Sequence, residues 1–215
     1  MTAELDPRRH LKLEGTYNTR DVGGYATSDG RQTRWGQFLR SDSLHKLSAK
    51  DQQDLLDYGV RAIIDLRKSV EIQDTLNVFF GSDKVTYYHQ SLTGDMIPAE
   101  WISSSPGNGY PEWEDLPEGH EYVERKRWGY SVVLDKRASA VRDTLRTLAS
   151  PDSFPALIHC AGGTDRTGMI AALVLGIARV PAETIAQDYA LTARFHLPRY
   201  LEAHPEIDPT NYTWQ

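Results

Sequence analysis

The sequence predicts an α/β fold with a central, largely parallel sheet of about four to five strands flanked by helices. Two observations predict it. Short apolar or aromatic runs alternate with longer stretches of helical spacing, and the run 154–158 is apolar throughout. A strand without polar positions suits the centre of a sheet that is covered on both faces. We expect a flexible arm at residues 1–14 and a single domain over residues 15–215, since this length can bury one sizeable core.

The first half of the chain supplies three of the predicted strands. They are residues 35–40, 60–66 and 85–89, each rich in apolar or aromatic side chains. Residues 15–34 contain many Gly, Asp and Thr and are predicted as loops. Ser48 is a suitable N-cap for a helix that runs to about Tyr58, where Gly59 ends it.

The second half begins with a long segment of irregular composition. Residues 93–119 are too rich in Gly, Pro and Ser for a regular element, and a loop of this length often forms a lid or binding loop. Residues 121–149 carry apolar side chains at helical spacing, so one face should turn to the core. We predict a fourth strand at residues 154–159, a nearly apolar helix at 168–180 and a further helix at about 182–193.

Composition and charge exclude several classes of function. The net charge of -6 argues against a nucleic-acid partner, because such proteins usually carry a basic surplus. The single cysteine, Cys160, excludes an intramolecular disulfide. No apolar run reaches the ~18 residues expected of a membrane span, and the N-terminal residues lack the layout of a signal peptide. We therefore expect a reduced, cytoplasmic protein without a membrane span; its oligomeric state is left undetermined.

One stretch between the fourth strand and the following helix carries the chemistry. It reads His159-Cys160-Ala161-Gly162-Gly163-Thr164-Asp165-Arg166-Thr167-Gly168. Ligands of open α/β sheets bind at the carboxyl ends of the strands. A helix N-terminus at that edge offers unpaired N–H groups and a partial positive charge to a phosphate. The five residues between Cys160 and Arg166 can curl into a nest of inward-pointing amides.

This stretch is predicted to be a phosphate-binding loop with Cys160 as the nucleophile. The phosphate-binding residues are Ala161, Gly162, Gly163, Thr164, Asp165 and Arg166. The two glycines allow the curled backbone, and Arg166 supplies a planar, two-pronged donor. The helix dipole, the amides and the guanidinium favour the thiolate. In supporting positions, Thr167 is expected to donate its hydroxyl to the sulfur, and His159 to fix the loop by a hydrogen bond.

The predicted reaction has two steps. The thiolate attacks phosphorus, which gives phosphocysteine and releases the alcohol or phenol. Water then hydrolyses the phosphocysteine. The amides and Arg166 stabilise the equatorial phosphate oxygens in both transition states. This route uses no metal and no cofactor.

The stretch resembles the signature of cysteine-based protein tyrosine and dual-specificity phosphatases, in which His-Cys is followed by five residues and then Arg-Ser or Arg-Thr. Other motifs are similar to the bacterial and fungal tyrosine-phosphatase branch related to mycobacterial secreted phosphatase B. They are residues 20–25, 38–42, 63–67, 186–192 and the Gly-x-Asp-Arg-Thr-Gly ending of the loop. The resemblance implies a tyrosine-phosphatase-like fold acting on a phosphorylated protein or peptide. Export without a signal peptide, known in that branch, stays open beside the cytoplasmic location.

The resemblance also implies a place for the general acid. The leaving oxygen needs a proton, and the Trp-Pro-Asp tripeptide that supplies it in many tyrosine phosphatases does not occur here. The branch carries its acid in the signature loop, so Asp165 is the first candidate. Asp95, on the long loop, is the alternative. The branch usually has Lys before the loop Asp, a residue associated with inositol-ring phosphates; Thr164 stands in that position and argues against lipid activity.

Three other functions share parts of this pattern. A phosphoinositide phosphatase has the same loop but favours extra lysines around it. A rhodanese-like sulfurtransferase also holds a cysteine in a curled loop, although the Arg166-Thr167-Gly168 ending favours phosphate. A catalytically inactive phosphate-binding module commonly lacks the Cys or the Arg, and both are present. Five charged residues outside the loop are interpreted as scaffold ion pairs or loop ties: Arg20, Asp21, Arg40, Asp65 and Arg67.

Overall fold

The computed structural model describes residues 6–94, 121–203 and 205. Its sheet has the strand order β1-β2-β5-β3-β4. The strands are β1 (Arg20–Asp21), β2 (Phe38–Ser41), β3 (Ala62–Asp65), β4 (Thr86–His89) and β5 (Ala156–His159). All neighbours pair in parallel except β1, which runs antiparallel to β2. The predicted α/β fold with a largely parallel sheet is confirmed.

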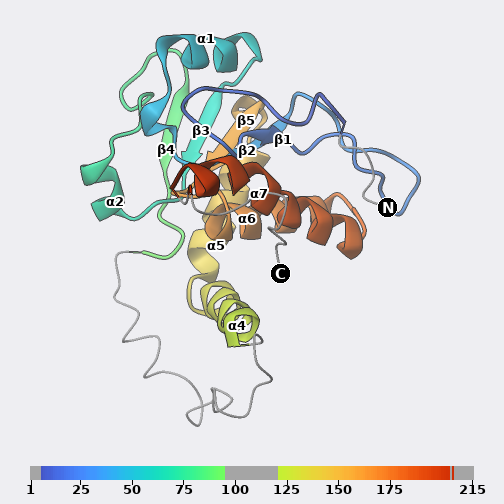
Figure 1. Cartoon of the computed structure of the whole chain (residues 1–215). Helices are drawn as coiled ribbons and strands as arrows, with labels where there is room; N and C mark the ends of the chain where they lie inside the picture. The colour runs from blue at the N-terminus through green and yellow to red at the C-terminus, as the bar shows by residue number, and fades with distance from the viewer. Residues whose placement is uncertain (1–5, 95–120, 204, 206–215) are drawn as a thin grey trace.

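Helices cover both faces of this sheet (Figure 1). They are α1 (Ala49–Asp57), α2 (Ser69–Asp74), α4 (Glu121–Lys136), α5 (Ala138–Ala149), α6 (Asp165–Ile177) and α7 (Ala182–Ala203). Alternate strand residues face opposite sides: Ile64 packs with α5 and α6, whereas Ile63 packs with α1. None of the helices described here is long and apolar enough to cross a membrane.

The start of α1 follows the sequence prediction. The Ser48 hydroxyl accepts a hydrogen bond from the Asp51 amide at 3.1 Å, and the Asp51 carboxylate accepts one from the Ser48 amide at 3.0 Å. This reciprocal cap satisfies two backbone donors that the first turn leaves unpaired. Gly59 follows the helix with φ +98°, a conformation that favours glycine.

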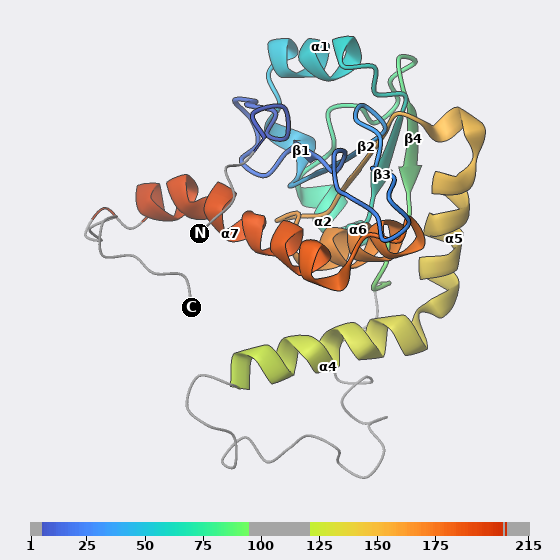
Figure 2. The ribbon, with the colours of Figure 1, turned by 90° about the vertical axis from the view of Figure 1, so that its right-hand side faces the viewer.

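Several helix boundaries differ from the predictions. Residues 121–149 form two helices, because Arg137 leaves helical geometry at φ -116° and ψ 23°; Figure 2 shows α4 and α5 at a steep angle. α6 begins at Asp165, so the last residues of the signature loop form its first turn. α7 runs on to Ala203 with Pro198 inside it. β1 lies in a segment predicted as loop, since a two-residue strand leaves no periodic pattern.

The described part of the predicted arm, residues 6–14, lies against the domain. The Arg9 guanidinium is buried and donates to the carbonyl groups of Asp21 and Gly23, both at 2.8 Å. It also lies over the Tyr25 ring, 3.9 Å from its centre. Because its partners are mainly backbone carbonyls, no sequence pattern marks this anchor. These contacts place residue 9 against the domain, and the flexibility of the arm stays a prediction.

Candidate active site

The signature loop, residues 160–166, connects β5 to α6 at the carboxyl edge of the sheet. β5 lies between β2 and β3, so Cys160 comes at the middle of that edge. Cys160 is a free cysteine and only 2% exposed. Its side chain is therefore almost wholly covered by the surrounding protein.

The carbonyl groups of the loop turn outward. Four successive carbonyls accept hydrogen bonds from surrounding donors: Cys160 from His159 Nδ1 (3.2 Å), Ala161 from the Ser43 amide (3.0 Å), Gly162 from His196 Nε2 (2.7 Å) and Gly163 from Arg40 (2.7 Å). Among the described residues, no partner is found for the amides of residues 161–164. Amides on the inner side of such a curl form an anion-binding nest.

The curl depends on glycine at position 163. Gly163 has φ +66°, and a Cβ there would lie 2.5 Å from the Ser41 carbonyl oxygen. Because that distance is far below van der Waals contact, a side chain would push the loop away from β2. The close approach brings the loop within reach of Arg40, whose guanidinium holds the Gly163 carbonyl.

His159 supports the loop from below in one defined tautomer. The Asn77 Oδ1 accepts from the Phe79 amide at 2.9 Å, so the Asn77 NH₂ group faces His159 Nε2 at 2.8 Å. Nε2 is therefore an acceptor, and the ring proton lies on Nδ1, which donates to the Cys160 carbonyl. Burial lowers the pKa of His159, which agrees with a neutral ring. This contact is the loop-fixing hydrogen bond expected of His159.

Arg166 lies at the rim of the loop and is held by Glu71 of α2. Its two terminal nitrogens donate to Glu71 Oε2 at 2.5 Å and Oε1 at 2.9 Å. Burial raises the pKa of Glu71, but the hydrogen bonds from Arg166 and the Lys68 amide outweigh it, and the pKa lies below its ordinary value. Sequence reasoning missed Glu71; its only signal was its place in the first turn of a short helix.

Asp165 contacts α4 across the mouth of the loop. Its Oδ1 accepts from Lys126 Nζ at 2.6 Å and from the Tyr130 hydroxyl at 2.5 Å. Its side chain is 41% exposed. The alternative acid, Asp95, lies outside the described residues. The Thr167 hydroxyl is buried and has no partner among the described residues, so its expected hydrogen bond to the Cys160 sulfur is not formed.

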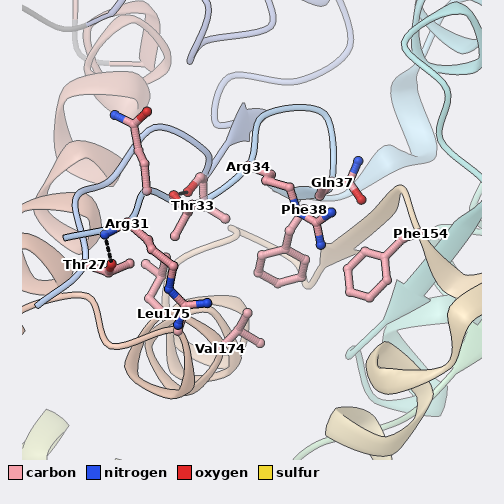
Figure 3. A pocket seen from close by; sticks show the side chains of 12 residues that line it. Thr27, Arg31, Thr33, Arg34, Gln37, Phe38, Phe154, Val174 and Leu175 are labelled. Atoms are coloured by element: carbon pink, nitrogen blue, oxygen red, sulfur yellow. Dashed lines mark hydrogen bonds between the residues drawn. The ribbon is translucent and has the colours of Figure 1, made fainter. Parts of the chain in front are cut away.

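A hollow of about 520 Å³ lies between the loop and α4. Charged residues line one part of it: Lys68, Glu71, Lys126, Asp165 and Arg166. Tyr130, Val133 and Met169 form an apolar part. A hollow of about 330 Å³ lies toward the other end of α6, where Leu175, Phe38 and Phe154 line it (Figure 3). That second hollow contains none of the predicted site residues. A third hollow, of about 520 Å³, is lined by Ala161 of the loop, but Asp165 and Arg166 both line the first, which is therefore the candidate site.

Behind the loop, Asp188 of α7 joins two buried arginines. Arg40 donates to Asp188 Oδ2 at 2.7 Å, and Arg20 donates to Oδ1 at 3.2 Å. Burial raises the pKa of Asp188, but the two guanidinium groups hold it at about 2. Arg67 pairs with Asp65 at 2.7 Å, and Asp21 accepts from the Gly23 amide at 2.6 Å. The interpretation of these residues as ion pairs and loop ties is confirmed.

Asp188→Asn is expected to destabilise the fold by about 3–5 kcal/mol at neutral pH, because two buried guanidinium groups would lose their counter-charge. The folded pKa of about 2 lies below the ordinary value of 3.8. The contribution of Asp188 is therefore present above pH ~4 and lost as the pH falls toward 2. Urea unfolding of both proteins across this range measures it.

The matched control is Asp29→Asn, because Asp29 pairs with Arg31 at 2.7 Å on the exposed surface. Exposed pairs contribute little, so this variant should unfold like the wild type. If the loss caused by Asp188→Asn were as large at the acid end as at neutral pH, the electrostatic account of the triad would be wrong.

The fold and the loop together place a buried cysteine directly after the central strand β5, on a loop whose carbonyls are held by surrounding donors, with Arg166 in the first turn of α6. Residues 11–209 match the tyrosine phosphatase family, and the chain belongs to that family. The resemblance carried by the sequence motifs is therefore confirmed.

Two curated relatives and two solved structures are similar to this chain. A tyrosine-protein phosphatase of Nostoc commune is 29% identical over 174 residues, which cover 79% of this chain and 51% of that protein. The triple specificity protein phosphatase PtpB of Mycobacterium tuberculosis is 24% identical over 196 residues, covering 83% and 67%. The chain thus spans about half the length of the Nostoc commune protein.

The structures are P. aeruginosa TpbA in complex with pTyr and the Siw14 catalytic core. TpbA is 12% identical with a TM-score of 0.38, and the match covers 86% of this chain and 79% of TpbA. Siw14 is 13% identical with a TM-score of 0.40, and the match covers 95% of this chain and all of the Siw14 core (100%). The strand order and pairing of this chain define its fold independently of these two structures.

Proposed function

We propose that this chain is a protein tyrosine phosphatase that hydrolyses phosphomonoesters through a phosphocysteine intermediate. The observation that carries the proposal is the loop itself: surrounding donors hold its carbonyls, and no partner is found among the described residues for the amides of residues 161–164. The site needs a negatively charged tetrahedral group to use these donors, and a phosphate ester supplies one. Family membership and the names of both curated relatives support the same activity.

In the proposed mechanism the loop supplies the phosphate-binding groups, the nucleophile and the general acid. The phosphate oxygens accept from the loop amides and from Arg166, and the Cys160 thiolate forms the S–P bond as the P–O bond to the leaving group breaks. Asp165 gives its proton to the leaving oxygen. In the second step water attacks phosphorus and the Asp165 carboxylate takes a water proton, which releases phosphate and restores the thiolate.

The walls of the hollow favour an aromatic ester. Tyr130, Val133 and Met169 offer apolar surface beside the charged rim, and the sulfur lies buried at the base of the loop. A phenyl ring can pack on such walls while its phosphate lies beside Asp165 and Arg166, which line the same hollow. We therefore propose phosphotyrosine in a protein or peptide as the substrate, and dual specificity toward phosphoserine or phosphothreonine as an extension. The cytoplasmic location stays a prediction.

A phosphoinositide phosphatase is the second candidate, and one observation favours it. The loop has Thr164 where a lysine was expected for such substrates, but Lys68 and Lys126 line the same hollow from other elements. Phosphate release from phosphotyrosine peptides and from phosphoinositides should be compared in the presence of a chelator. Activity that requires a metal would exclude the covalent route, and faster release from phosphoinositides would favour the second candidate.

Asp165→Asn is expected to lower kcat/KM for a phosphotyrosine peptide on the order of 10²-fold, since an amide cannot protonate the leaving oxygen. The pH–rate profile should also lose the limb at which activity falls with rising pH. Asp95→Asn serves as the comparison and should keep both activity and limb. The reverse result would make Asp95 the acid.

A further inference from the structure

The two donors to Asp165 contact the same oxygen. Lys126 Nζ lies 2.6 Å and the Tyr130 hydroxyl 2.5 Å from Oδ1. No donor to Oδ2 is found in the part of the chain that the structure describes. A carboxylic acid carries its proton on one oxygen, and an oxygen that already accepts two hydrogen bonds is the less suitable one. The contacts therefore distinguish the two oxygens of Asp165.

Tyr130 is the more rigid of the two donors. Its hydroxyl lies 2.6 Å from the Tyr189 hydroxyl of α7. Because Tyr130 has one proton and gives it to Asp165, Tyr189 must donate to Tyr130. Burial raises the pKa of Tyr130, and the hydrogen bonds to Asp165 and Tyr189 raise it further, so it remains a donor at neutral pH. A tyrosine has two side-chain torsions, whereas Lys126 reaches Asp165 on a flexible four-carbon stem.

We propose that Tyr130 is a positioning residue that fixes Asp165 Oδ2 as the oxygen that carries the catalytic proton. Tyr130 holds Oδ1 from α4, Tyr189 holds the Tyr130 hydroxyl from α7, and Asp165 itself begins α6. Three helices thus set the rotation of one carboxyl group. The inference rests on the proposed role of Asp165 as the general acid.

The test compares two aryl phosphates that differ in their leaving groups. Phenyl phosphate releases the more basic phenolate and depends strongly on the acid, whereas p-nitrophenyl phosphate depends on it less. Tyr130→Phe keeps the ring on the wall of the hollow and removes only the hydroxyl. We expect it to lower kcat/KM for phenyl phosphate by ~10-fold, the effect of one hydrogen bond to a charged group, with a clearly smaller loss for p-nitrophenyl phosphate.

The matched control is Tyr58→Phe. The Tyr58 hydroxyl also donates to a carboxylate at 2.5 Å, that of Asp21, which lies outside the site. Its loss should leave the ratio of the two rates unchanged. Asp165→Asn is measured alongside, and Tyr130→Phe is repeated in that background, where it should cause no further loss if it acts through Asp165.

The outcomes separate the inference from the proposed function. If Asp165→Asn slows both substrates alike, the assignment of the acid is wrong. Asp165→Asn should slow phenyl phosphate more than p-nitrophenyl phosphate. If it does so but Tyr130→Phe slows both substrates equally, Tyr130 is only structural. The same conclusion follows if Tyr130→Phe causes the same loss in the Asp165→Asn background as in the wild type. Melting temperatures of the variants report any loss of folding.

Discussion

Cys160→Ser is expected to lower kcat/KM for a phosphotyrosine peptide on the order of 10⁵-fold, as removal of a catalytic nucleophile does elsewhere. A serine hydroxyl ionises far less readily than a thiol, so the loop would hold a neutral, weak nucleophile. The fold should persist, because the two side chains are similar in size and Cys160 lies at the floor of a loop held by its carbonyls. Steady-state kinetics and the melting temperature measure the two effects.

Peptide binding supplies the control for this variant. The loop amides and Arg166 remain in Cys160→Ser, so the Kd of a phosphotyrosine peptide should stay within a few-fold of the KM of the wild type. Retained turnover would show that the sulfur is not the nucleophile. Lost turnover together with lost binding and a lowered melting temperature would show only that the loop had collapsed. The same measurements would then be made on Cys160→Ala in place of Cys160→Ser.

Arg166→Lys is expected to lower the same kcat/KM on the order of 10³-fold, although the charge is kept. Arg166 meets Glu71 through two parallel hydrogen bonds, at 2.5 Å and 2.9 Å, which fix the plane of the guanidinium. A lysine presents one point charge, so it cannot bind Glu71 and two phosphate oxygens in a fixed plane. The inhibition constant for inorganic phosphate should rise together with the loss of kcat/KM.

Arg146→Lys is the control for this substitution, because Arg146 lies on α5 with its side chain 73% exposed. It should leave kcat/KM and phosphate inhibition unchanged. A loss below about tenfold for Arg166→Lys would contradict the view that a planar, two-pronged donor is needed at the rim.

The buried cluster of Asp188, Arg20 and Arg40 is only partly predictable from the sequence. The sequence indicates that Arg20 and Arg40 are scaffold residues but does not indicate their partner, because Asp188 is 148 residues from Arg40 along the chain. Asp188 lies in the motif at residues 186–192, which indicates the family but not the role of the aspartate. Its role as the counter-charge of two buried arginines follows from α7 packing behind the loop. Such a contact leaves no local pattern.

The proposed chemistry could be read from the sequence: a cysteine, five loop residues and an arginine between a buried strand and a helix. Those properties depend on residues that are close along the chain, whose geometry local spacing fixes. The residues that surround the loop could not be predicted in this way, since Glu71 is 95 residues from Arg166 and Lys126 is 39 residues from Asp165 along the chain. Which distant side chains meet the loop depends on how α2, α4 and α7 pack against the sheet, and packing is a property of the whole chain.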